Sequence, residues 1–217
     1  MIDVVGVTKS YRVERAYRTV LENVSVHLGR DDRLDVLGAG GAGKSTLIRL
    51  IAGAEAVDEG VIRTDGRISW PLGFSGGLHP GLSGDENARV IARLYSVDGD
   101  ELSAYCHHFS ELGDDFYAPV SVYSGGMKGR LSFALSMGVP FDCYIADEVT
   151  GMGDSQFKEK CAVALEEKLR NTALFLVSKN TRTVDRFCNR FGVLESGQLF
   201  VFDSLEQAEA RFSLVQG

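Results

Sequence analysis

Short apolar runs alternate with helical patterns in the first part of the chain. A strand is predicted where the run is short and rich in β-branched residues, and a helix where apolar residues recur every three or four positions. By these criteria a helix covers residues 46–52, and Gly53 ends it. The strands predicted in the same part are residues 2–7, 20–28, 34–37, 61–63 and 66–70.

The middle third of the chain has a different character. Residues 71–84 hold Pro80 and several glycines, which indicates a loop rather than a packed element. The helices predicted after this loop are residues 85–95, 101–112 and 126–137. Alternation then resumes with strands over 143–145 and 173–177, helices over 155–169 and 183–188, a hairpin over 192–202, and a last helix from Ser204 to Ala210.

This order of elements predicts an α/β protein with a mixed sheet flanked by helices. We expect one domain over residues 1–217. Its core would be residues 1–70 and 141–217, including an N-terminal antiparallel β part. Residues 71–140 would form a helical subdomain inserted into that core.

Composition narrows the functional classes. The 217 residues carry a net charge of -7 and give a pI of about 5.2. No nucleic-acid surface is expected, because binding phosphate backbones needs clustered Lys and Arg. The start of the chain does not resemble a signal peptide, and no run reaches the ~20 apolar residues of a membrane helix.

The cysteines do not predict a metal site. They are widely spaced and include no C-x-x-C pair, so a zinc site is not expected and a reducing compartment fits. These residues are Cys106, Cys143, Cys161 and Cys188.

A glycine-rich loop carries the clearest chemistry. Residues 38–45 follow the pattern G-x-x-x-x-G-K-[ST], with a predicted strand before them and a predicted helix after them. Glycines let backbone N–H groups converge on phosphate oxygens, and the helix directs its positive end at the same anion. In this pattern Lys44 reaches the terminal phosphates and Ser45 binds Mg²⁺. The loop therefore predicts ATP and Mg²⁺ as ligands.

A second acidic motif follows a later apolar strand. Asp147 and Glu148 come directly after residues 141–146, at the end of that strand. In phosphate-loop ATPases an aspartate in this place helps to hold Mg²⁺, so we assign that role to Asp147. Glu148 would orient or deprotonate the attacking water. A solvated pair at a strand end is the alternative, and the glycine loop upstream favours the catalytic interpretation.

One short segment indicates a family. Tyr123-Ser124-Gly125-Gly126-Met127, about twenty residues before Glu148, resembles the Leu-Ser-Gly-Gly-Gln signature of ABC transporter nucleotide-binding subunits. The resemblance covers nearly the whole chain and implies a P-loop NTPase core of the ABC ATPase type. It also implies that Ser124, Gly125 and Gly126, at a helix N-terminus, contact the γ-phosphate.

The resemblance assigns further residues to ATP. Tyr11 lies where the family has an aromatic side chain that stacks on adenine, and an exposed tyrosine at a strand end is the alternative. Asp154 matches the aspartate of the family's D-loop. In the phosphate loop the implied contacts are Gly38, Gly41, Gly43, Lys44, Ser45 and Thr46.

The resemblance also implies partners and a location. In the family the signature of one copy meets the ATP of another, which predicts a homodimer that encloses two nucleotides. The second partner would be a polytopic membrane permease. The chain would then work as a peripheral subunit on the cytoplasmic face of the inner (plasma) membrane.

Within the family the chain is most similar to the subunits that energise capsular polysaccharide export. The residues that carry this likeness are Ile68 to Leu72, Gly76-Gly77, Leu82 to Gly84, Glu86-Asn87 and the signature. Export of O-antigen, teichoic acid or another lipid-linked glycan is an alternative. A soluble ATP-binding switch with little turnover is an alternative of another class.

Departures from the family pattern bear on the rate of hydrolysis. No Gln occurs before Gln156, although most members have one in the middle loop. Lys179 stands where the family usually has a histidine that contacts the γ-phosphate. Lysine donates hydrogen bonds but cannot accept a proton at neutral pH, so Lys179 could neutralise phosphate charge but not relay a proton. We therefore expect hydrolysis that is slow but present, because the catalytic Glu148 remains. Asp35, a charge within the strand before the glycine loop, is expected to be paired or at a sheet edge.

Overall fold

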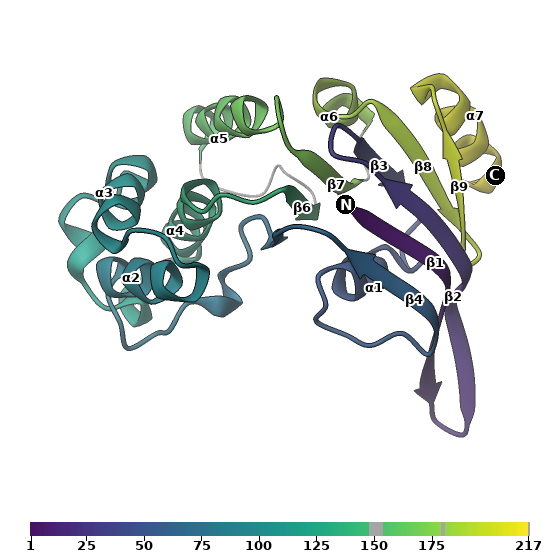
Figure 1. The fold of residues 1–217 in the computed structure, drawn as a ribbon, viewed down its shortest axis with the longest axis horizontal. Coiled ribbons are helices and arrows are strands. Elements are labelled where there is room, and N and C mark those ends of the chain that lie inside the picture. Colours follow the sequence, from purple (N-terminus) through teal and green to yellow (C-terminus); the bar gives the residue numbers. More distant parts are fainter. Residues whose placement is uncertain (148–153, 179–180, 217) are drawn as a thin grey trace. The chain divides into compact units, whose positions relative to one another are not determined.

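The computed structural model describes residues 1–147, 154–178 and 181–216, which form two compact units. The first unit comprises residues 1–71, 141–149 and 169–217, as far as they are described, and the second comprises residues 72–140 and 150–168 in the same sense. Figure 1 shows the strands of the first unit in two sheets and the second unit as a group of helices.

A three-stranded antiparallel sheet opens the first unit. Its strand order is β2-β1-β4. The bounds are β1 Ile2–Val13, β2 Ala16–Leu28 and β4 Glu59–Thr64. The first strand extends well past residue 7, where the apolar pattern ends, because its polar second half pairs through the backbone with β2 as a hairpin. The predicted antiparallel part is confirmed, and its first strand was predicted too short.

The second sheet has six strands in the order β5-β6-β7-β3-β8-β9. All neighbours are parallel except the β8–β9 hairpin, so the sheet is mixed, as predicted. Leu34 lies opposite Phe175 on one side and Arg190 on the other, which fixes the central register. The bounds are β3 Arg33–Leu37, β5 Ile68–Pro71, β6 Cys143–Asp147, β7 Ala173–Ser178, β8 Arg190–Glu195 and β9 Gln198–Phe202.

Helices cover both faces of this sheet. Leu34 and Val36 of β3 pack in the same apolar cluster as Leu47 and Ile48, which belong to the helix after the glycine loop. Leu37 points to the opposite face and packs with Val184 and Ala208 from the two C-terminal helices. Successive side chains of β3 point to opposite faces of the sheet, so this strand contributes to the apolar core on each face. The bounds are α1 Lys44–Ile51, α6 Thr181–Phe187 and α7 Leu205–Gln216.

The second unit is helical. Ser83 begins α2 through a capping box with Glu86, and the Asp98 side chain caps α3. Phe109 of α3 packs against Phe133 and Phe157, whose ring centroids each lie 6.0 Å away. The helix bounds are α2 Gly84–Tyr95, α3 Gly99–Ser110, α4 Gly125–Gly138 and α5 Ser155–Lys168, with short 3-10 turns η1 Ser75–Gly77, η2 Gly113–Tyr117 and η3 Val120–Val122.

Asp35 is the polar exception in the first unit's core. It lies in β3 between β7 and β8 and is fully buried, so the expected sheet edge is wrong. Neither carboxylate oxygen has a hydrogen-bond partner of regular geometry among the described residues. Burial raises the pKa of Asp35 to about 7, and the nearby Ser178 hydroxyl offsets part of that rise. No partner of regular geometry is thus found among the described residues, and the expected pairing stays a prediction.

Candidate nucleotide-binding site

The glycine loop joins β3 to α1 in a conformation that requires glycine. Gly41 and Gly43 have φ angles of 80° and 107°, in the region that side chains rarely adopt. A Cβ atom on Gly43 would lie only 2.9 Å from the Val20 carbonyl oxygen. The loop therefore packs directly against β2 at Gly43, whereas a Cβ atom on Gly40 or Gly41 would meet open space.

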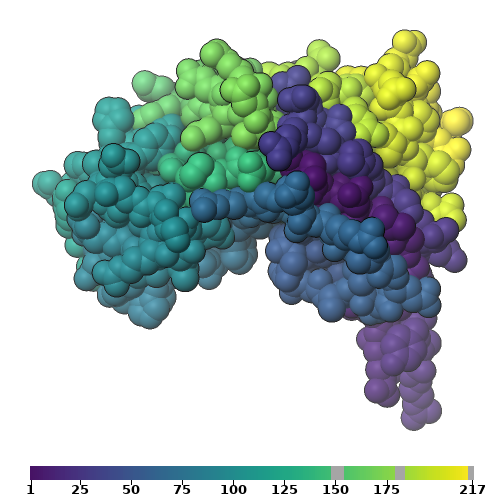
Figure 2. All heavy atoms as spheres, viewed as in Figure 1, coloured from purple at the N-terminus to yellow at the C-terminus, as the bar shows by residue number. Residues whose placement is uncertain are grey.

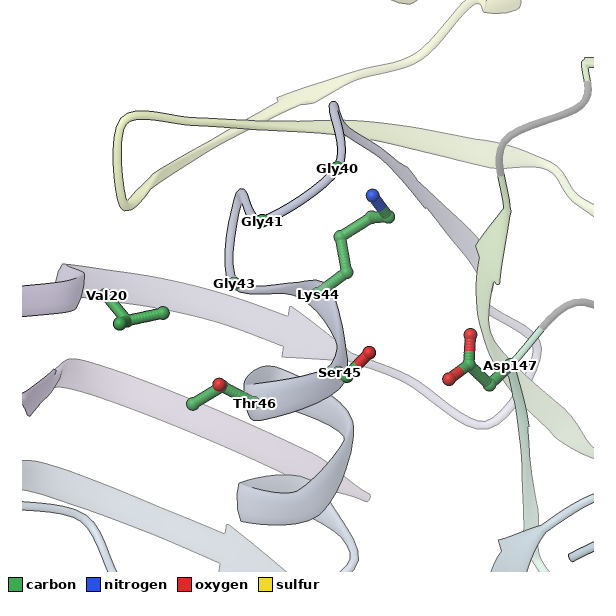
Figure 3. Close-up of a pocket in the computed structure, with 8 residues that line it drawn as sticks. All are labelled: Val20, Gly40, Gly41, Gly43, Lys44, Ser45, Thr46 and Asp147. Carbon is green, nitrogen blue, oxygen red and sulfur yellow. The ribbon is translucent and has the colours of Figure 1, made fainter. Parts of the chain in front are cut away.

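A cavity of about 570 Å³ lies over this loop. Figure 3 shows its lining, which comes from β2, the loop, the first turn of α1 and the end of β6. The lining residues are Val20, Gly40, Gly41, Gly43, Lys44, Ser45, Thr46 and Asp147. The cavity thus brings together most of the phosphate-loop residues predicted from the sequence with the acidic residue of a distant strand.

Lys44 brings a positive charge to the cavity. Its side chain is largely buried, and Nζ donates hydrogen bonds to the carbonyl oxygens of Gly38 and Ala39, the latter at 2.9 Å. Gly38 does not line the cavity, but its carbonyl holds the lysine. The ammonium group is therefore positioned by the loop itself beside the N-terminus of α1, and both attract an anion.

Ser45 and Asp147 provide oxygen ligands of the kind that Mg²⁺ prefers. Figure 3 shows the Ser45 hydroxyl on α1 and the Asp147 carboxylate at the end of β6 facing the same space. A hydroxyl and a carboxylate together can hold a hard divalent cation that also needs phosphate oxygens and water. The residues present thus fit Mg²⁺ bound together with a nucleotide.

Tyr11 lies beside the cavity rather than in its lining. Its hydroxyl donates to Glu55 Oε2 at 2.8 Å and lies 3.4 Å from Thr46 Oγ1, which belongs to the lining. Arg49 donates to the same hydroxyl at 3.1 Å. The ring is therefore fixed at its outer end, next to the first turn of α1. Its role toward adenine stays a prediction.

The signature residues lie in the second unit, at the start of α4. The Ser124 hydroxyl accepts a hydrogen bond from the Met127 amide at 3.2 Å and caps the helix. Tyr123 fixes the preceding turn, because its hydroxyl donates to the Asp115 carbonyl oxygen at 2.7 Å. All three residues Ser124, Gly125 and Gly126 are exposed. An exposed helix N-terminus with a hydroxyl suits an anion, and the contact with the γ-phosphate stays a prediction.

Asp154 lies directly before α5 and is held by Arg130 of the signature helix, α4. One carboxylate oxygen accepts from the Phe157 amide at 2.9 Å, and the other accepts from Arg130 of α4 at 2.8 Å. The Arg130 guanidinium also lies 4.3 Å from the centre of the Phe157 ring and bonds Glu111 at 3.1 Å. These contacts lower the pKa of Asp154, mainly through the Phe157 amide, and keep it ionised.

Two predicted residues, Glu148 and Lys179, lie outside the described residues. Each follows a strand end, after Asp147 and Ser178 respectively. Sequence reasoning missed Val20, which lines the cavity. An apolar residue within a predicted strand carries no signal of a site, so only the packing of β2 on the loop reveals it.

The lengths and hydropathies of the described helices show whether any of them could span a membrane. Among residues 1–147, 154–178 and 181–216, no helix is long and apolar enough to cross a bilayer.

The loop, the buried lysine and the two oxygen ligands define a P-loop nucleotide-binding protein. Residues 21–151, more than half of the chain, match the family model described as ABC transporter. The chain therefore belongs to the ABC transporter family, as its signature segment predicted.

Curated relatives extend this match over almost the whole chain. The protein is 44% identical to the ATP-binding protein BexA of Haemophilus influenzae over 100% of both chains. It is 45% identical to the capsule polysaccharide export ATP-binding protein CtrD of Neisseria meningitidis over 96% of both. A polysialic acid transport ATP-binding protein, KpsT of Escherichia coli, is 40% identical over 87% of this chain and 85% of its own length.

Solved structures share the fold at lower identity. A dimeric ATP-binding cassette bound to ADP and phosphate superposes with a TM-score of 0.81, at 21% identity, over 94% of this chain and 98% of its own. An ATP-binding subunit of an ABC transporter gives a TM-score of 0.84 at 20% identity, over 100% and 95% of the two chains. The predicted α/β fold of the ABC ATPase type is confirmed.

Proposed function

We propose that the protein is the ATP-binding and hydrolysing subunit of a capsular polysaccharide exporter. The observation that carries this proposal is the 45% identity to a capsule polysaccharide export protein over 96% of both chains. Relatives named for O-antigen export and teichoic acid export are less similar, at 35% and 30% identity. The subunit would act at the cytoplasmic face of the inner membrane, bound to a polytopic permease.

The proposed chemistry is transfer of the γ-phosphoryl group of ATP to water. The loop amides and Lys44 would hold the β- and γ-phosphates of ATP, and Thr46 would hold its α-phosphate. Ser45 and Asp147 would hold Mg²⁺, which neutralises phosphate charge when it is bound. Glu148 would orient the water and take its proton as the water oxygen bonds to phosphorus. The bond to the ADP oxygen breaks in the same displacement.

A second copy of the chain would complete each site. Ser124, Gly125 and Gly126 would reach the γ-phosphate bound to the other copy, with Asp154 near the interface. This proposal is supported by the exposed N-terminus of α4, which belongs to the second unit, whereas the glycine loop belongs to the first. It is also supported by the dimeric cassettes among the similar structures. ATP would then close the dimer and move the membrane subunit.

Replacing Ser124 by arginine tests the composite site. We expect Ser124→Arg to bind ATP with unchanged affinity but to remain monomeric, because the added side chain would fill the phosphate contact of the opposite copy. Light scattering with ATP, in a Glu148→Gln background that retards hydrolysis, measures the dimer. Ser124→Thr, which keeps the helix cap, is the matched control and should dimerise. A Ser124→Arg dimer of wild-type stability would contradict the proposed composite site.

Isolation from membranes tests the exporter itself. We expect the tagged chain, extracted in mild detergent, to bring down a polytopic membrane protein and to hydrolyse ATP slowly with it. Glu148→Gln should abolish the activity, and Lys179→His should raise it, because imidazole can accept and return a proton. A permease typical of O-antigen or teichoic acid export would redirect the proposal to those glycans. Recovery of soluble partners alone would favour an ATP-binding switch and overturn it.

A further inference from the structure

The β1–β2 hairpin extends beyond the nucleotide cavity. Its last four residue pairs are regular, with Ser10 opposite Thr19, Tyr11 opposite Arg18, Arg12 opposite Tyr17, and Val13 opposite Ala16. Figure 2 shows the end of this hairpin (purple) standing clear of the neighbouring segments of its unit. Its side chains are therefore available to a ligand that reaches past the cavity.

Alternation divides this hairpin into two faces. Residues that lie directly opposite in an antiparallel pair point to the same face, so Tyr11 and Arg18 share one face. Arg12 and Tyr17 share the other, because successive residues alternate. The face of Tyr11 is the one turned toward α1, since the Tyr11 hydroxyl contacts Thr46 and Glu55. Arg18 thus lies on the α1 face of the hairpin, and Arg12 does not.

The Tyr11–Arg18 pair lies next to residues that line the cavity. Val20 lines the cavity at a register shift in the hairpin, and Arg18 is two residues earlier in β2, toward the hairpin turn and about 7 Å away. Thr46, the Tyr11 contact, lines the cavity from α1. A nucleotide with its phosphates on the glycine loop and its ribose past Val20 and Thr46 would place its base at Tyr11 and Arg18.

Arg18 has an exposed guanidinium group that no described residue holds. Its side chain is exposed, and it makes no hydrogen bond or ion pair with the described part of the chain. Arg49 differs, because Glu55 and the Tyr11 hydroxyl hold it at 3.1 Å each. A guanidinium plane stacks on nucleobases as aromatic rings do, whereas an ammonium group is a compact point charge.

We propose that Arg18 is a positioning residue for the nucleotide base, which it holds by planar contact together with Tyr11. This inference rests on the proposed binding of ATP by the glycine loop. The base would lie against the α1 face of the hairpin, with the Tyr11 ring and the Arg18 guanidinium as its neighbours. Arg18 would then raise the affinity for ATP through its contact with the base. The contribution of the phosphates to the affinity would not depend on Arg18.

Calorimetry on three variants tests the role of Arg18. We expect Arg18→Ala to weaken ATP binding roughly five-fold, the size of a single stacking or cation–π contact. Binding of inorganic tripolyphosphate, which has no base, should be unchanged. Arg18→Lys should be as weak as Arg18→Ala, because it keeps the charge but loses the plane. Arg12→Ala, on the opposite face, is the matched control and should bind ATP like the wild type.

Any other result would overturn either the proposed role of Arg18 or the binding of ATP by the glycine loop. Equal losses for ATP and tripolyphosphate, or rescue by Arg18→Lys, would mean that Arg18 acts only as a long-range charge and would overturn the proposal. An Arg18→Ala protein with wild-type ATP affinity would overturn it directly. Failure of the wild type to bind ATP would instead refute nucleotide binding by the glycine loop, so the two proposals fail separately.

Discussion

Replacing Lys44 by alanine is expected to weaken ATP binding about a hundredfold and to abolish hydrolysis. Lys44 is the charged side chain that the glycine loop holds at the cavity, and its Nζ is fixed by the carbonyl oxygens of Gly38 and Ala39. Hydrogen bonds from a charged group contribute about 1.5–3 kcal/mol each, and about 2.7 kcal/mol corresponds to a hundredfold change in affinity. Calorimetric titration with ATP measures the loss.

A matched variant separates this effect from a general loss of charge. Lys158 is exposed on α5, in the other unit, and Lys158→Ala removes one cation without touching the cavity. We expect that variant to bind and hydrolyse ATP like the wild type. Circular dichroism should show both variants folded. Near-normal ATP affinity in a folded Lys44→Ala protein would refute the phosphate site.

Replacing Asp35 by asparagine is expected to stabilise the protein at alkaline pH. The carboxyl group is fully buried, and desolvation raises its pKa to about 7, whereas an unfolded aspartate has a pKa of about 4. The folded state therefore favours the protonated form, and stability is lost as pH rises from about 4 to about 7. A difference of about three units corresponds to roughly 4 kcal/mol of lost stability above pH 7.

Asparagine resembles the protonated acid in shape and removes the charge, but its amide also lacks partners in this site. We therefore expect a gain of about 2 kcal/mol in the free energy of unfolding at pH 8.5, shrinking to zero or below at pH 5. Urea unfolding at both values of pH measures it. Asp65→Asn, at an exposed position, is the control and should show no such trend. A pH-independent effect of Asp35→Asn would show that Asp35 stays in one protonation state.

Local patterns were enough to predict most elements of the fold. The helix after the glycine loop, the strand before Asp147 and the helix after Ser124 all lie within one or two residues of their predicted bounds, because periodicity and capping are local properties. The second half of β1 was missed because it is a strand only through its pairing with another segment. Its residues are polar, and the hydrogen bonds that make it a strand come from β2.

The candidate site likewise contains residues that a local motif predicts and residues that only tertiary packing reveals. The spacing of the glycines, Lys44 and Ser45 predicted the phosphate loop, since the loop is continuous in the chain. Asp147 was found through its place at the end of an apolar strand that follows the phosphate loop in the chain. Val20 carries no polar chemistry, and it became a site residue only because Gly43 packs against its backbone. The face occupied by Arg18 likewise depends on the register of a hairpin.

The sequence by itself determined the ligand class, the family and the order of elements, because each is written in short motifs with a fixed local geometry. The tertiary structure decided the burial of Asp35, the convergence of Ser45 and Asp147 on one cavity, and the pairing of Arg18 with Tyr11. These depend on which strands become neighbours and in what register. That choice is made by hydrogen bonds and packing between segments far apart in the chain, which no local pattern specifies.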